Sequence, residues 1–155
     1  MNNKDIKVLE KVYANVDNYD WDAISEGDRY YRKIDYPADA IQSSNVYYSQ
    51  IKRGLIIVSG TYLVRFYYEE DNYTWDKKYF ASLISERENI ISSIAFITND
   101  DYVDMIANKD LFGISRKIEK QLGGERPNII VSLYDIVNRK VSGADELYSE
   151  FLDDE

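Results

Sequence analysis

The segment from residue 54 to residue 98 constrains the fold more than any other part of this chain. It is rich in Ile, Val, Tyr, Phe and Thr, the residue types that fit a pleated, half-buried surface. Gly60, the acidic segment 69–72 and the polar segment 86–89 divide it into pieces of strand length. We therefore predict three or four consecutive antiparallel strands at the centre of the fold.

Alternation of side chains indicates the two faces of the predicted strand 61–69. Only the first face is wholly apolar, which is typical of an antiparallel sheet with one wetter side. Gly60 is expected to mark a bulge or a turn before this strand. The first face carries Tyr62, Val64, Phe66 and Tyr68. The second face carries Leu63, Arg65, Tyr67 and Glu69. The other strands predicted in this region cover residues 45–53, 55–59, 73–84 and 90–97.

The segments on either side of this region predict helices. Apolar residues recur at helical spacing over residues 4–16. Residues 98–101 are N-cap types followed by acids, which predicts a short helix beginning there. A further helix is expected over residues 111–122, where a Gly-Gly pair ends it. Residues 128–137 are apolar enough for a central strand, and Ser142 is expected to cap a last helix.

These elements predict an α+β fold. The 155 residues fit one domain, 1–155, which is large enough to bury a stable core. We expect a mainly antiparallel sheet of about five strands. The N-terminal, middle and C-terminal helices are expected to pack on one face of it, the last helix through Leu147, Phe151 and Leu152.

Cysteine and histidine are both absent, which excludes much chemistry. Neither disulfides nor thiolate metal sites can form, and catalytic triads lack their imidazole base. Short acidic motifs, at Asp20 and Asp22, at 100–104 and at 76–78, match carboxylate metal sites only weakly. We therefore expect no metal site, no cofactor and no enzymatic activity. A hydrolase or nuclease that uses carboxylates and a divalent metal is kept as an alternative.

The charge balance predicts the kind of partner. Asp and Glu number 28 against 19 Lys and Arg, a formal net charge of −9. Such a field repels nucleic acid and anionic membranes and attracts basic proteins. Residues 1–11 carry charges where a signal peptide needs an apolar core, and no segment approaches the ~18 apolar residues of a membrane span. We expect a soluble cytoplasmic protein without direct nucleic-acid or membrane contact.

Tyrosine is the most informative residue type, with 15 copies that include doublets at 30–31, 47–48 and 67–68. Adjacent side chains on a strand point to opposite faces, so a doublet there places one ring on each. If helices cover one face only, the other displays rings, and exposed tyrosine favours a protein interface. The alternative is that both faces are buried.

Acidic stretches at 17–28, 69–71 and 145–155 suggest where a basic partner binds. Convergence of two stretches on one face would produce a surface that occludes a basic cleft. The resulting prediction is a small acidic protein-binding module of the inhibitor type, such as a toxin-immunity or phage anti-defence protein. A structural homo-oligomer is the second alternative. The predicted contact residues are Asp20, Trp21, Asp22, Tyr67, Glu69, Glu70 and Asp71.

Overall fold

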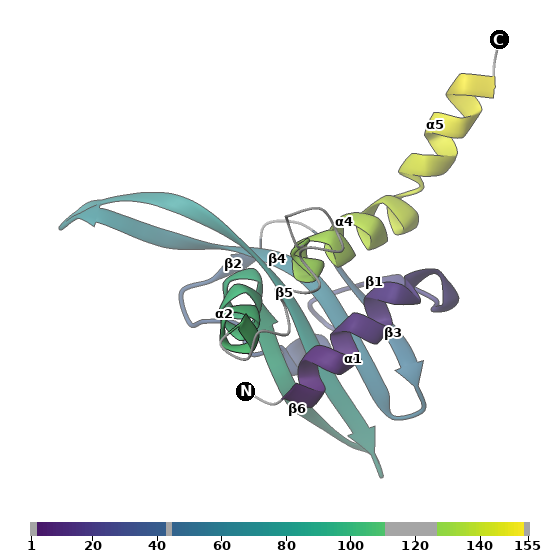
Figure 1. Cartoon of the computed structure of the whole chain (residues 1–155), viewed down its shortest axis with the longest axis horizontal. Helices are drawn as coiled ribbons and strands as arrows, with labels where there is room; N and C mark the ends of the chain where they lie inside the picture. Colours follow the sequence, from purple (N-terminus) through teal and green to yellow (C-terminus); the bar gives the residue numbers. More distant parts are fainter. Residues whose placement is uncertain (1–2, 43–44, 111–126, 154–155) are drawn as a thin grey trace.

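The computed structural model describes residues 3–42, 45–110 and 127–153, and within them six strands form one antiparallel sheet (Figure 1). The strand order is β1-β3-β4-β5-β6, and β2 pairs separately with β4. The predicted α+β class and the mainly antiparallel sheet are thus confirmed. The strands are β1 (Asp22–Ile24), β2 (Ile41–Gln42), β3 (Val46–Lys52), β4 (Leu55–Glu69), β5 (Asn72–Arg87) and β6 (Ile90–Thr98).

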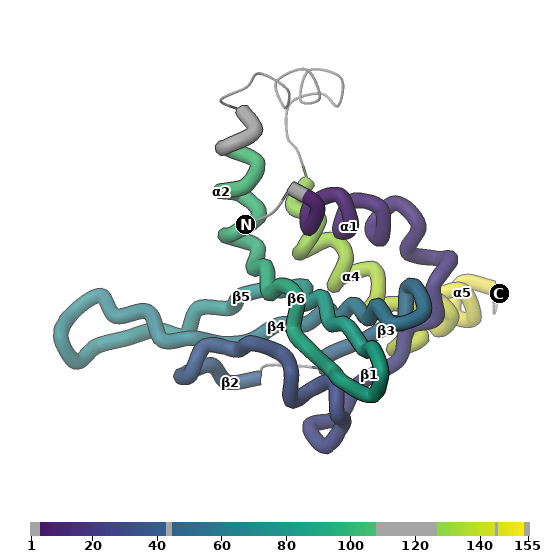
Figure 2. Tube along the Cα trace, turned by 90° about the horizontal axis from the view of Figure 1, so that it is seen from below, coloured from purple at the N-terminus to yellow at the C-terminus, as the bar shows by residue number. Residues whose placement is uncertain are grey.

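Three helices lie on the same side of the sheet, and a fourth extends away from it (Figure 2). The predicted N-terminal helix is confirmed, and the predicted helix over 111–122 lies outside the described residues. No helix in the described segments is long and apolar enough to cross a membrane. The helices are α1 (Asn3–Ala14), α2 (Asn99–Asp110), α4 (Ile129–Ser142) and α5 (Ala144–Asp153), with short 3-10 turns η1 (Val16–Asn18) and η2 (Tyr31–Lys33).

The start of α2 follows the predicted capping chemistry. Thr98 and Asp101 cap each other reciprocally: the Thr98 hydroxyl accepts from the Asp101 amide at 3.0 Å, and the Asp101 carboxylate accepts from the Thr98 amide at 2.9 Å. This exchange satisfies amides that the first helical turn would otherwise leave unpaired. The chain can therefore pass from β6 into α2 without an intervening loop.

The strand predicted over 128–137 is wrong, because these residues form α4. The Asn128 side chain accepts hydrogen bonds from the amides of Ile130 and Val131, so it caps the helix. An apolar run of this length suits a buried strand and a buried helix equally, and the cap and helical spacing decide between them. The side chains of α4 that are buried at helical spacing are Ile129, Ile130, Leu133, Tyr134 and Val137.

Both faces of the sheet body are buried, so of the two alternatives for the tyrosines, the buried one holds for the body. The first core lies between the sheet and α1, α2 and α4, and the second lies under the segment 24–40 on the opposite face. Tyr47 packs into the first core and Tyr48 against the second, so this doublet divides between the faces as predicted. The tyrosines of the body are thus mainly core residues.

Gly60 lies within a continuous β4, so the bulge or turn predicted there is wrong. It pairs directly with Phe80 of β5, and an added Cβ would lie 2.8 Å from the Phe80 ring. Glycine is therefore required at this position because the ring covers the backbone of the neighbouring strand. The second core is built around this contact.

Alkaline pH is expected to destabilise the fold through the buried tyrosines. Burial raises the pKa values of four tyrosines, Tyr30, Tyr36, Tyr47 and Tyr62. The pKa of Lys78 is also raised, because its ammonium group donates hydrogen bonds to Asp100 and Asp76. Phenols of the unfolded chain ionise near pH 10, before the folded ones. The contribution of these tyrosines to the free energy of unfolding is therefore fully present below pH 10. Above pH 10 it falls by at most about 1.4 kcal/mol per pH unit for each tyrosine.

Urea unfolding between about pH 8 and 11, followed by circular dichroism, measures this dependence. Tyr36→Phe should reduce the loss above pH 10 because it removes one buried phenol. Tyr68→Phe is the matched control, since the Tyr68 ring is exposed. Equal alkaline losses in the wild-type protein and Tyr36→Phe would show that Tyr36 does not contribute.

Candidate functional site

The β4–β5 hairpin extends beyond the body of the molecule as a two-stranded projection, which we call the arm (residues 64–76; Figure 1). β4 and β5 contain 15 and 16 residues, whereas β3 and β6 contain 7 and 9. Pairing with β6 ends where Phe80 meets Thr98, and pairing with β2 ends at Leu63. Beyond these points no further strand among the described residues pairs with the hairpin, so the arm lies in solvent on both faces.

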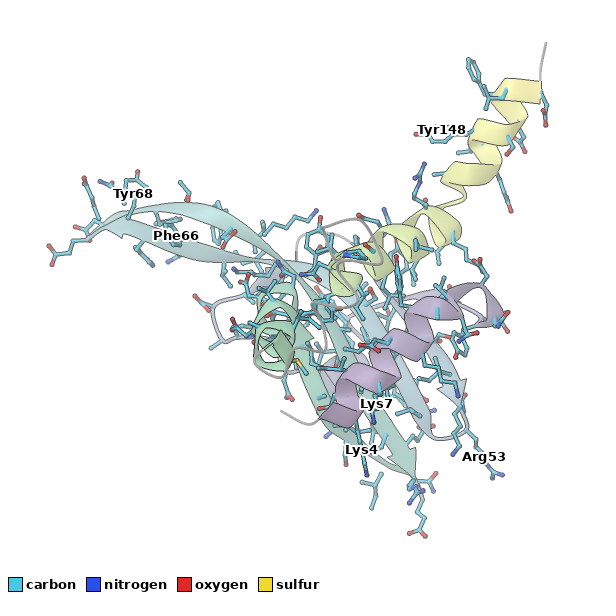
Figure 3. The ribbon with its side chains drawn as sticks, viewed as in Figure 1. Lys4, Lys7, Arg53, Phe66, Tyr68 and Tyr148 are labelled. Carbon is cyan, nitrogen blue, oxygen red and sulfur yellow. The ribbon has the colours of Figure 1, made fainter. Side chains whose placement is uncertain are left out.

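Large aromatic side chains on the arm are exposed, which is unusual for a monomer's surface. A two-stranded hairpin is only marginally stable in water, so nothing in the arm's own folding requires so many rings. Figure 3 shows Phe66 and Tyr68 well away from the body. The exposed fractions are 59% for Phe66, 53% for Tyr67, 60% for Tyr68, 39% for Tyr73 and 43% for Trp75.

One face of the arm, which we call the aromatic face, combines rings with cations. It consists of Arg65, Tyr67, Tyr73 and Trp75 of the arm together with Lys77 at its base, which the strand register places on one face. The Tyr73 ring lies 5.4 Å from Tyr67 and 5.6 Å from Trp75, between ring centroids. The Arg65 guanidinium lies 4.9 Å from the Tyr73 centroid and 5.6 Å from that of Trp75. These cation–π contacts hold the rings in place while leaving them in solvent.

The end of the arm, which we call the acidic tip, carries Glu69, Glu70 and Asp71, all exposed. Asn72 donates a side-chain hydrogen bond to Glu69 at 3.0 Å, and no basic residue lies between 69 and 72. The structure thus brings together four of the predicted contact residues, Tyr67 and the three tip acids. They form a negatively charged end on an aromatic stem.

The other predicted contact residues, Asp20, Trp21 and Asp22, lie elsewhere. Asp22 begins β1, and Ala23 pairs with Tyr47, which pairs with Ser59 of β4. The tip lies farther along β4, at Glu69, a displacement of about 33 Å at the ~3.3 Å rise per residue of a strand. The two groups therefore cannot form one acidic face, and the condition that these two acidic stretches converge is not met.

Trp21 is positioned by the fold rather than presented to solvent. Its ring is half-buried against the first core, and its indole N–H donates to the Val16 carbonyl at 3.0 Å. No strand was predicted for this stretch, so β1 was missed. Because the indole joins η1 to the core, Trp21 is less available than the arm's rings to act as an aromatic anchor.

Asp20 and Asp22 share an open hollow of ≈ 690 Å³ with basic residues of the same chain. Lys52 and Arg53 line its other side, which balances the local charge. An adjoining hollow of ≈ 720 Å³ is lined by Arg29, Arg53 and Arg87 (Arg53 is labelled in Figure 3). This end of the molecule is therefore mixed in charge and does not form an acidic surface.

The carboxylates do not gather as a metal site would require. Within residues 3–42, 45–110 and 127–153, no group of three or more acidic side chains is placed to hold a metal ion. Lys78 bridges Asp76, at 3.0 Å, and Asp100. Asp76, from the weak motif at 76–78, and Asp100, from that at 100–104, are therefore ion-paired with the same lysine, while Lys77 lies over the Tyr79 ring at 5.0 Å.

Helix α5 is a second exposed feature, and it was predicted to pack on the sheet. It instead extends from the end of α4, where Gly143 adopts the left-handed conformation (φ 73°) that ends the helix (Figure 1). Helical periodicity indicates an amphipathic segment but not whether a neighbour covers its apolar side. The exposed fractions are 61% for Leu147, 59% for Tyr148, 78% for Phe151 and 71% for Leu152.

Comparisons with known proteins add no assignment to these features. No protein-family model matches the chain, and neither a curated protein nor a solved structure matches it. The function is therefore argued from the geometry of the arm and of the surfaces around it.

Proposed function

We propose that this protein is a binding module that inserts its arm into a cleft of another protein. The observation that carries this proposal is the exposed, pre-ordered set of rings on the aromatic face. Tyrosine, tryptophan and arginine are the residues that most often dominate binding energy at interfaces. A projecting β-hairpin can reach a recess that the compact body cannot enter.

The chemistry of the arm specifies the partner's surface. The stem offers aromatic area, and the tip offers Glu69, Glu70 and Asp71 without a compensating base. The complementary cleft has apolar walls and Lys or Arg side chains at its end. The net charge of −9 would steer such a basic partner toward this protein. The mechanism is occlusion, as in an inhibitor of a nuclease or of a nucleic-acid-binding complex, either an immunity protein or a phage anti-defence protein.

The arm favours this function over the two alternatives. A metal-dependent hydrolase needs clustered carboxylates, and those of the described segments are separated or engaged in ion pairs. A homo-oligomer joined through the sheet needs an exposed sheet face, and both faces of the sheet body are covered.

Reversal of the tip charges is expected to abolish capture of the partner. Glu69→Lys, Glu70→Lys and Asp71→Lys together place three cations opposite the basic cleft, and we expect at least a tenfold loss of affinity. Folding should be unchanged because exposed loop charges contribute little to stability. The measurement is a pull-down from lysates of the source and its competitors, with the bound partner then purified and titrated.

The matched control changes the net charge of the protein by the same amount, but on α5, through Glu146→Lys, Glu150→Lys and Asp153→Lys. This variant should still capture the partner, because α5 and the arm extend in opposite directions (Figure 1). Equal loss in both triple variants would mean that overall charge, and not the arm, determines capture. Unchanged affinity in the tip variant would remove the tip from the binding site.

A further inference from the structure

Helix α5 carries a continuous apolar stripe with no neighbour to cover it among the described residues. At about 100° per residue, Leu147, Tyr148, Phe151 and Leu152 occupy one side of the helix. Each is more than half exposed, and Figure 3 shows Tyr148 far from the body. A ten-residue helix is too short to be stable in water by itself. The stripe is thus a surface that gains stability when another surface covers it.

The remaining surface of α5 is acidic. Glu146, Glu150 and Asp153 lie away from the stripe, with Glu150 bordering it beside Leu147. No Lys or Arg occurs between residues 144 and 153. Helices that lie on membranes carry cations on the polar side, so this charge pattern disfavours a lipid surface. Two α5 helices packed on each other would also bring like charges together. The complementary surface is apolar and basic.

The aromatic face of the arm has these properties. It presents Tyr67, Tyr73 and Trp75 together with the cations of Arg65 and Lys77. Its length from Tyr73 to Lys77 is about 13 Å at ~3.3 Å per residue, and α5 is about 15 Å long at ~1.5 Å per residue. The two surfaces are therefore similar in length, both apolar, and opposite in charge.

The arm and α5 extend from opposite ends of the molecule, so they cannot meet within one chain (Figures 1 and 2). We propose that α5 of one copy binds the aromatic face of the arm of a second copy. This contact is heterologous, since each copy contributes a different surface, and the pair retains one free arm and one free α5. Such a contact propagates from copy to copy into head-to-tail chains, or into a closed ring where the rotation between copies allows it.

The proposed interface is small, because a single helix covers only two strands, so the self-association is weak. We expect a dissociation constant on the order of 100 µM, in the range of transient contacts. Sedimentation velocity from about 10 to 500 µM should show the average mass of the wild-type protein rising with concentration, and added salt should reduce the rise.

Complementary variants test the head-to-tail geometry. Tyr73→Ser with Trp75→Ser removes the aromatic face, and Leu147→Ser with Phe151→Ser removes the stripe. Each double variant alone should remain monomeric, because every contact requires one intact surface of each kind. An equimolar mixture has one intact arm and one intact α5 per pair, so it should form dimers that do not grow further. Circular dichroism checks that both variants fold, as expected for exposed positions.

Three results would overturn the proposal. The first is a wild-type protein that stays monomeric at about 500 µM. The second is either double variant associating as the wild-type protein does, which would indicate another interface. The third is a mixture that remains monomeric. The tip variant Glu69→Lys, Glu70→Lys, Asp71→Lys separates this proposal from the proposed function, because it should lose the foreign partner and keep the self-association.

Discussion

Phe80→Ala is expected to lower the free energy of unfolding by about 4 kcal/mol, a large share of the 5–15 kcal/mol that stabilises a typical domain. Phe80 is fully buried, and its ring stacks on Phe96 at 4.9 Å between centroids. It also meets the rings of Tyr36 at 5.2 Å and Tyr62 at 6.0 Å. Truncation would open a cavity at the centre of the second core, which these rings cannot refill without moving.

Urea unfolding followed by circular dichroism measures this loss, with Phe66→Ala as the matched control. The control makes the same Phe-to-Ala change at an exposed position on the arm, where the free energy of unfolding should fall by only about 0.5 kcal/mol. Similar losses in the two variants would contradict the burial that the structure assigns to Phe80.

Gly60 provides a second control on the same contact. Gly60→Ala should cost about 1 to 3 kcal/mol in the wild-type protein, because the new methyl group lies against the Phe80 ring. Local strand preference predicts the opposite sign, since alanine is normally favoured over glycine there. In the Phe80→Ala background the methyl group enters space that the ring vacated, so the cost should fall to the part caused by Val46 Cγ2, which would lie 3.0 Å from the added Cβ. An undiminished cost would mean that Phe80 is not what requires glycine.

Tyr73→Ser with Trp75→Ser is expected to weaken partner binding about a thousandfold while the body stays folded. Two aromatic residues of the kind that dominate interfaces are worth some 2 kcal/mol or more each when a cleft buries them. The rings contact each other and Arg65 but not the two cores, so the body does not depend on them. Titration of the purified partner measures the affinity, and thermal unfolding measures the fold.

The matched control removes two aromatic residues of the arm that do not belong to the aromatic face, as Phe66→Ser with Tyr68→Ser. Any fraying of the hairpin should be similar in both double variants, since each loses two rings. Only the first should lose the partner if the aromatic face is the contact. Loss in both would mean that the arm's rigidity matters rather than this particular face. Full binding in the first variant would reject the arm as the main contact.

The sequence by itself determined the strands, turns and helix cap that depend only on residues close to one another in the chain. Strand-forming residues over 54–98, with polar breaks at 69–72 and 86–89, predicted the central hairpins at nearly the observed positions. Two residues of the second turn, Glu88 and Asn89, adopt positive φ values, as a tight hairpin connection requires. The cap at Thr98 was likewise predicted because its partner, Asp101, is three residues away.

Tertiary structure decided which of these elements are covered. The alternation of residues 61–69 predicted one buried face, but β3 and β6 end before the arm, so both faces meet solvent. The segment 24–40 returns over the second face of the body and buries tyrosines that the pattern allowed to be exposed. Periodicity records which side chains share a face, whereas burial depends on where distant segments of the chain end and return. The same reason leaves the stripe of α5 uncovered, whereas residues 128–137 form a helix because of local signals, the Asn128 cap and the helical spacing of its apolar residues.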